Sequence, residues 1–135
     1  MGTRSLTILL EEDGTEIVIM YKQFDGNPTA HGQELADFLK DHKVVNGFQP
    51  GDTLKNTFNG AGCMAAAVVA HFKDDIGNVY LYPSGARDAG EEYTYTVRPE
   101  GKKIRLICEA GKTTIFNGYP EEFNGEKIEA KANEE

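Results

Sequence analysis

The segment from Tyr21 to Gly32, YKQFDGNPTAHG, gathers residue types that could carry out chemistry. It contains Asp25 and His31, and Glu34 follows His31 by three residues, a spacing that a helix places on one side. Two carboxylates with an imidazole could activate water or hold a metal ion. However, the segment has neither an HExxH nor an HxH motif, and a flexible Gly32 follows the histidine. A small hydrolase using Asp25, His31 and Glu34, with or without a metal, is therefore the least supported of three hypotheses.

A second segment with ligand-binding potential is Asn59-Gly60-Ala61-Gly62, which precedes an apolar helical run. Backbone N–H groups at a helix start can hold an anion, and the same holds for residues 26–32. Tyrosines on the predicted strands could stack on a flat ring beside these helix starts. The candidate ligand-binding residues are Gln23, Asp25, Asn27, His31, Gly32, Asn59, Gly62 and Tyr82. Neither a Walker A loop nor a GxGxxG motif is present.

These residues support the first hypothesis, a non-catalytic module that binds or sequesters a small ligand. A nucleotide is one candidate ligand, and we predict no cofactor. Each residue taken singly also has a structural interpretation, which we favour. Small residues on a helix usually serve close packing, a histidine can fix a loop by a hydrogen bond, and tyrosines pack in cores and across strands.

Nucleophilic catalysis has little support in the sequence. No GxSxG motif is present, and Cys63 has no base beside it in the chain. Cys63 and Cys108 are too few for a disulfide framework and indicate free thiols in a reducing cytosol. His42 and His71 fall at the ends of predicted helices, where an imidazole complements the helix dipole without a catalytic role.

The charge of the chain limits its partners. The 135 residues carry a formal net charge of −8, and 39% of them are hydrophobic, enough for a real core. No cluster of Lys or Arg is evident along the chain, which disfavours DNA or RNA as a partner. The N-terminal residues lack the pattern of a secretory signal, and no apolar run is long enough to span a bilayer. We therefore expect no membrane association and a cytoplasmic location.

The elements that must position these residues begin with a hairpin. Strands around residues 6–10 and 17–21 flank Asp13-Gly14, a strong turn signal. The expected register pairs Leu6 with Tyr21, Ile8 with Ile19, and Leu10 with Ile17. The opposite face of the hairpin is half apolar through Leu9, Val18 and Met20. This face motivates the remaining hypothesis, a homo-oligomeric interaction factor or one that binds a host protein.

Two helices and a meander follow the hairpin. Apolar spacing predicts a helix that begins at Asn27-Pro28 or at Gly32 and ends near His42. A loop follows, and then a helix over 59–72 that is apolar almost all round, a pattern that is typical of a buried helix. Strands follow at 78–83, 93–97, 103–108 and 113–118, with Val97 opposite Ile104 and Ile115 beside Leu106. The predicted fold is a single α+β domain over residues 1–125, with two helices on one face of a mainly antiparallel sheet. Residues 126–135 are predicted to be a charged, flexible tail.

Several separate motifs occur together in this chain. They include MGTRSLT at the start, the pattern Y-x-Q-x-D-G-x-P-x-x-H-G at 21–32, and the Gly/Ala-rich second helix. In this order they resemble a family of small uncharacterised proteins of phages and bacteria, over most of the chain up to about Gly118. The resemblance implies a phage-type accessory protein in the cytoplasm of a bacterial host. It carries no catalytic residues over to this chain.

Overall fold

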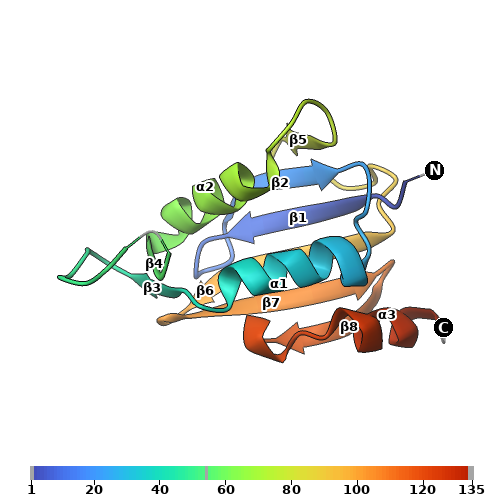
Figure 1. The fold of residues 1–135 in the computed structure, drawn as a ribbon. Helices are drawn as coiled ribbons and strands as arrows, with labels where there is room; N and C mark the ends of the chain where they lie inside the picture. Colours follow the sequence, from blue (N-terminus) through green and yellow to red (C-terminus); the bar gives the residue numbers. More distant parts are fainter. Residues whose placement is uncertain (1, 54, 134–135) are drawn as a thin grey trace.

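A six-stranded sheet forms the centre of the molecule (Figure 1). The computed structural model describes residues 2–53 and 55–133. The strand order is β5-β2-β1-β6-β7-β8, and neighbouring strands are antiparallel except β1 and β6, which are parallel. The strands are β1 (Ser5–Leu10), β2 (Glu16–Lys22), β5 (Val79–Tyr82), β6 (Tyr93–Glu100), β7 (Lys103–Ala110) and β8 (Thr113–Gly118). This arrangement confirms the predicted α+β fold.

Two helices, α1 (Gln33–Leu39) and α2 (Gly60–Phe72), pack on one face of the sheet, as predicted (Figure 1). A π-helical turn, η1 (Pro28–Gly32), leads directly into α1, so Pro28 occupies the first helical position, where its missing N–H costs nothing. Leu35 and Leu39 of α1 share one hydrophobic cluster with Met64 and Val68 of α2 and with the inward side chains of the sheet.

The second helix is less buried than its apolar sequence suggests. Met64 and Val68 are fully buried, but Ala66 and Ala70 are exposed. The prediction of a buried helix is therefore confirmed for its inner side and wrong for its outer side. The helix rests on β1 and β2 with one side only, and the small side chains of its outer side face solvent.

The predicted loop between the helices contains a second, two-stranded sheet. Strand β3 (Lys43–Val45) pairs in parallel with β4 (Thr57–Asn59). The N–H of Val44 also donates a hydrogen bond to the carbonyl of Lys102, at 2.9 Å. Burial of Val44 and Phe58 holds this small sheet against the end of the main one.

The register of the first hairpin is confirmed where the strands are regular. Leu6 faces Tyr21 and Ile8 faces Ile19, but a bulge between Leu9 and Leu10 places Leu10 opposite Glu16. The predicted pair of Leu10 with Ile17 is therefore not formed, because the connecting turn is wider than two residues.

Both faces of this hairpin are covered by the chain itself. Leu9 and Met20 lie beneath the helices, fully buried. On the opposite face, the hairpin residues pack with Ala86 and Ala89 of the segment between β5 and β6. The half-apolar face of the first hairpin is therefore not available as an interaction surface.

The meander is shifted by two residues from the predicted register. Val97 faces Leu106 and Pro99 faces Ile104, around a two-residue turn at Gly101-Lys102. The pairing of β1 with β6 ends at Val97. Pro99 has no backbone N–H, but at its position no strand lies on the β1 side to accept a hydrogen bond. The proline can therefore remain within the strand. Since the shift is even, the same side chains still face the core.

The next hairpin also departs from the predicted pairing. Gly118 lies opposite Leu106, where Ile115 was expected. The turn lies at Gly111-Lys112 instead of Ala110-Gly111, which moves the partner by two residues, and a bulge between Cys108 and Glu109 adds a third. Ile115 is nevertheless buried in the main cluster. The bulge shifts the pairing but keeps the apolar side chain on the core side.

The C-terminal segment contains a helix where the sequence predicted a flexible tail. After the short turn η2 (Pro120–Glu122), helix α3 spans Gly125–Asn133. Ile128 is buried, and Glu129 accepts hydrogen bonds from the side-chain amide of Asn27 and the backbone N–H of Thr29, at 3.0 and 3.1 Å. Residues 134–135 of the predicted tail lie outside the described residues.

Candidate functional site

His31 is a buried structural residue. Its side chain is almost fully buried, with 1% of the residue surface exposed, and its Nε2 lies 2.8 Å from the hydroxyl of Thr7 on β1. The ring packs against Phe72 and Tyr95, with centroid distances of 4.5 and 5.0 Å. Burial, together with the positive charges of Lys22 and His71, lowers the pKa of His31 to about 3. The imidazole is therefore neutral at physiological pH and fixes η1 to the sheet.

The acids of the hydrolase hypothesis do not converge on this histidine. The side chain of Asp25 is exposed at a left-handed position (φ 59°), and only its backbone carbonyl accepts the N–H of His31, at 3.0 Å. Glu34 instead pairs with His71 of α2, at 3.0 Å. Within residues 2–53 and 55–133, no group of three or more His, Cys, Asp or Glu is arranged to hold a metal ion. Asp25, His31 and Glu34 therefore do not form one site.

The other candidates in the segment 21–32 also have structural roles. Asn27 bonds to Thr29 and Glu129, which ties η1 to α3. The backbone N–H of Gln23 donates to the carbonyl of Asn78, at 2.7 Å. A Cβ at Gly32 would lie only 2.8 Å from the ring of Phe123, so this close approach requires glycine. The segment is a tightly packed strand-to-helix junction.

The remaining three candidates, Tyr82, Asn59 and Gly62, lie elsewhere, and Gly62 is exposed in the first turn of α2. Tyr82 on β5 stacks on Tyr21 at 5.1 Å, on the face of the sheet that is turned away from the helices. Gly26 bonds to Thr3 just before β1, whereas Asn59 lines a cleft beside Glu11, just after β1. The two helix starts that the sequence joined into one pocket therefore lie at opposite ends of β1.

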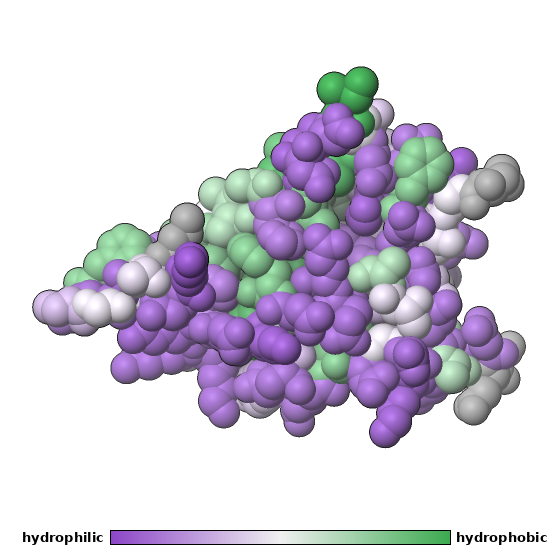
Figure 2. All heavy atoms as spheres, in the orientation of Figure 1, coloured by the Kyte–Doolittle hydropathy of each residue, from purple (hydrophilic) through white to green (hydrophobic). Residues whose placement is uncertain are grey.

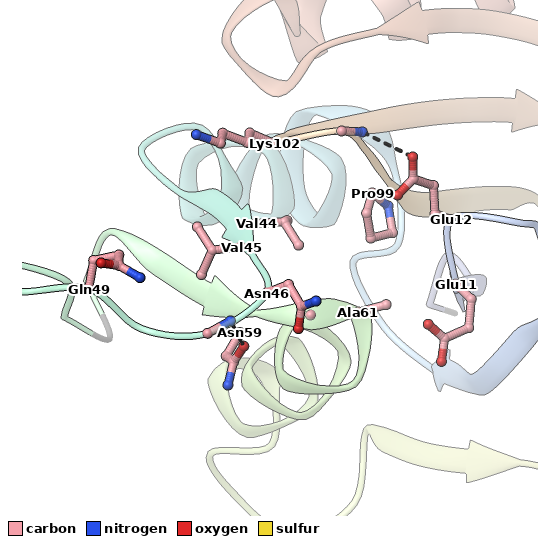
Figure 3. A pocket seen from close by; sticks show the side chains of 13 residues that line it. Glu11, Glu12, Val44, Val45, Asn46, Gln49, Asn59, Ala61, Pro99 and Lys102 are labelled. Atoms are coloured by element: carbon pink, nitrogen blue, oxygen red, sulfur yellow. Dashed lines mark hydrogen bonds between the residues drawn. The ribbon is translucent and has the colours of Figure 1, made fainter.

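An open cleft of about 500 Å³ lies where β1, β3, α2 and the β6–β7 turn meet (Figure 3). Its walls carry two carboxylates, three side-chain amides and four aliphatic side chains. These residues are Glu11, Glu12, Asn46, Gln49, Asn59, Val44, Val45, Ala61 and Pro99. Of the residues predicted to bind a ligand, Asn59 alone lines this cleft.

Hydrogen bonds fix the rim of the cleft. Glu12 accepts the N–H of Gly101 at 3.3 Å, which joins the β1–β2 turn to the β6–β7 turn (Figure 3). Asn59 accepts the N–H of Gly47 at 2.8 Å, and this bond holds the loop after β3 at the start of α2. Sequence reasoning missed the cleft because its walls come from four segments that are remote in the chain. The Asn59-Gly60 pair before α2 was the one local signal.

The outer side of α2 and strand β5 carry exposed apolar residues. Figure 2 shows hydrophobic residues gathered over α2 and around β5. Ile76 is 92% exposed and Leu81 56% exposed, and Ala66 and Ala70 add the outer side of the helix. We call these four residues the apolar face.

The free edge of β5 itself is protected. The ammonium group of Lys73 donates to the carbonyls of Gly77 and Val79, each at 3.0 Å, and Pro83 follows the strand without an N–H. A lysine and a proline at a sheet edge oppose the addition of another strand. A partner would therefore meet the side chains of the apolar face rather than the backbone of β5.

Comparisons of the chain with protein-family models, with curated proteins and with solved structures find no match. Among the described residues, the helices are all too short or too polar to cross a bilayer.

Proposed function

We propose that the protein is a non-catalytic binding module that holds a small polar ligand in the cleft of Figure 3. The observation that carries the proposal is the composition of this cleft, whose lining combines side-chain amides and carboxylates with aliphatic side chains. Concave sites with an apolar lining and a few hydrogen-bonding groups are typical of small-molecule binding. The resemblance to phage and bacterial proteins supports an accessory role in a bacterial cytoplasm.

The charges of the cleft restrict the ligand. Glu11 and Glu12 place two carboxylates on its wall, and Lys102 is the one basic residue among those that line it. Such a wall repels a phosphate group and attracts a cation or a neutral hydrogen-bonding molecule. We therefore assign to the cleft an uncharged or cationic ligand. A nucleotide, the candidate from the sequence, would have to keep its phosphate away from these glutamates.

Native mass spectrometry of protein expressed in bacteria and purified gently tests this proposal. It reports any co-purified small molecule, and thermal unfolding with a nucleoside, an amino acid amide and a polyamine extends the test. A ligand at about 100 times its Kd stabilises the folded state by about 2.7 kcal/mol. Val45→Trp should fill the cleft and abolish the effect, whereas Thr114→Trp on the exposed surface of β8 is the matched control. Equal ligand binding by the two variants would contradict the assignment.

A second candidate function, homo-oligomeric assembly, is favoured by the apolar face. Ile76 and Leu81 are large apolar side chains that are exposed to solvent, and hydrophobic residues also lie over α2 in Figure 2. Exposed apolar residues that gather on one side of a protein are typical of interaction sites. This face replaces Leu9, Val18 and Met20, the residues from which the sequence predicted an interaction surface.

A further inference from the structure

A second hollow, of about 250 Å³, lies between the end of α1, strand β3, the start of β7 and η2. Four lysines line it, Lys40, Lys43, Lys102 and Lys103, and we call it the lysine groove. Its apolar walls are Leu39, Ile104 and Pro120. Of the residues that line the cleft of Figure 3, only Lys102 also lines this groove. The two hollows therefore differ in both position and chemistry.

The groove concentrates positive charge in an acidic protein. The chain has 14 basic and 22 acidic residues, and four of those 14 surround this one hollow. They come from two pairs that lie about 60 positions apart in the sequence, so the concentration arises only on folding. Four ammonium groups around a small hollow repel one another and create a local positive potential.

The carboxylates of the protein compensate this charge only in part. Lys43 pairs with Asp52 at 3.0 Å, and Lys40 approaches Asp37 at 3.7 Å in an exposed pair of small value. Among the described residues, neither Lys102 nor Lys103 forms an ion pair. Glu121 is the one carboxylate that lines the groove. A net positive charge therefore remains.

The aromatic wall of the groove is held in place by its own network. The hydroxyl of Tyr119 donates to Glu100 at 2.6 Å, and Arg105 donates two hydrogen bonds to the same carboxylate, each at 3.0 Å. Lys103 lies over the Tyr119 ring, 4.8 Å from its centroid. Because Glu100 is already engaged by Arg105 and Tyr119, it is not free to neutralise the lysines.

We propose that the lysine groove binds the diphosphate group of a small molecule. Lysine ammonium groups are strong phosphate ligands. Several ammonium groups around one small hollow suit a ligand with adjacent negative charges better than a ligand with a single negative charge. The apolar walls add contact surface for an organic substituent. Inorganic pyrophosphate and a nucleoside diphosphate share this chemistry, and both are used as probes. The proposal does not depend on ligand binding in the cleft of Figure 3.

Isothermal titration of the full chain with pyrophosphate, ADP and citrate tests the proposal. The double variant Lys40→Gln/Lys103→Gln removes two groove charges, and neither residue lines the other cleft. The control is Lys112→Gln/Lys127→Gln, which removes two exposed lysines that do not line the groove. We expect pyrophosphate affinity to fall about tenfold or more in the groove variant and to stay within about twofold in the control, since a tenfold change corresponds to only 1.4 kcal/mol.

The pattern of affinities separates the sources of the anion. ADP binding more tightly than pyrophosphate supports a nucleoside diphosphate, and equal affinities support any diphosphate group. Weakening by added salt is expected in both cases. Citrate binding as tightly as pyrophosphate would overturn the diphosphate assignment. Absence of pyrophosphate binding, or equal binding by the groove and control variants, would overturn the site itself.

Amide chemical-shift mapping with pyrophosphate provides a second measurement that does not depend on the variants. Shifts should centre on Lys43, Ile104 and Tyr119, which line or border the groove. Shifts spread evenly over the lysines of the surface would contradict a defined site. Because Val45→Trp fills only the cleft of Figure 3, it should retain pyrophosphate binding, and this keeps a failure of one proposal distinct from a failure of the other.

Discussion

At the scale of single residues, the types that suggested chemistry mainly serve packing. His31 and Gly32 both occupy tightly packed positions. Phe72 and Tyr95 pack against the imidazole of His31, and Phe123 and Tyr95 lie close to Gly32. A sequence shows that a histidine follows an acid at a given spacing, but it does not show which way each side chain points. Burial decides that His31 is neutral and held by Thr7.

His31 predicts a specific dependence of stability on pH. Its ordinary pKa of 6.5 applies to the unfolded chain, and burial lowers the pKa to about 3 in the folded one. Between these values the unfolded state binds a proton that the folded state does not. The free energy of unfolding should therefore fall as pH decreases through this window, by up to about 1.4 kcal/mol per pH unit from this residue.

Urea unfolding of wild type and His31→Gln between pH 4 and pH 7 measures this contribution. In His31→Gln, the free energy of unfolding should depend less steeply on pH, by an amount that corresponds to the uptake of up to one proton on unfolding. This holds even if the variant is less stable overall. Phe72→Leu is the control, because it loosens the packing around the imidazole without removing the titrating group. A slope that is unchanged in His31→Gln would show that another group binds the proton.

At the scale of elements, periodicity identified the six strands of the main sheet and helices α1 and α2, but not all of the strand pairings. Even register shifts, as in the β6–β7 hairpin, leave the core face unchanged, so the hydrophobic pattern cannot distinguish them. The alternation of apolar and polar residues does not indicate the bulges after Leu9 and Cys108. Helix α3 was missed because its sequence is charged, with Ile128 as a single buried anchor.

Helix α3 should contribute to the stability of the whole fold, not only to its own end. Ile128→Ala removes its buried anchor, and truncation of this kind in a core costs about 2–5 kcal/mol, with the lower end expected at a chain terminus. The exposed neighbour Lys127→Ala should change the free energy of unfolding by less than about 0.5 kcal/mol. Urea unfolding followed by fluorescence compares the two variants. An unchanged stability in Ile128→Ala would show that α3 is detached in solution.

At the scale of the whole molecule, the surface features that we assign to binding are the apolar face, the cleft of Figure 3 and the lysine groove, and the last two carry opposite charge. The apolar face consists of Ile76, Leu81, Ala66 and Ala70, and the protected edge of β5 limits how a partner can approach it. The apolar face results from the arrangement of the two layers. The helices cover one face of the sheet, and α2 is the last helix before the edge strand β5 (Figure 1).

If the apolar face assembles copies of the chain, its disruption should produce monomers. Light scattering after gel filtration should show a dimer or larger assembly for the wild type and a monomer for Ala66→Lys/Leu81→Lys. Both positions are exposed, so the fold should tolerate the change, and Thr114→Lys on β8 is the control. A wild-type protein that is monomeric at every concentration would contradict assembly through this face.

The sequence alone determined the α+β class, the first hairpin and the helix layer, because each depends on hydrophobic alternation or helical spacing within a short stretch. The side of the chain that faces the core followed from the same periodicity, even where the register was shifted. Only the tertiary structure brought Glu11 and Asn59 into the lining of one cleft, and Lys40, Lys43, Lys102 and Lys103 into the lining of one groove. Such sites join segments that are distant in the chain, and their geometry depends on how the strands and turns pack, which local patterns do not specify.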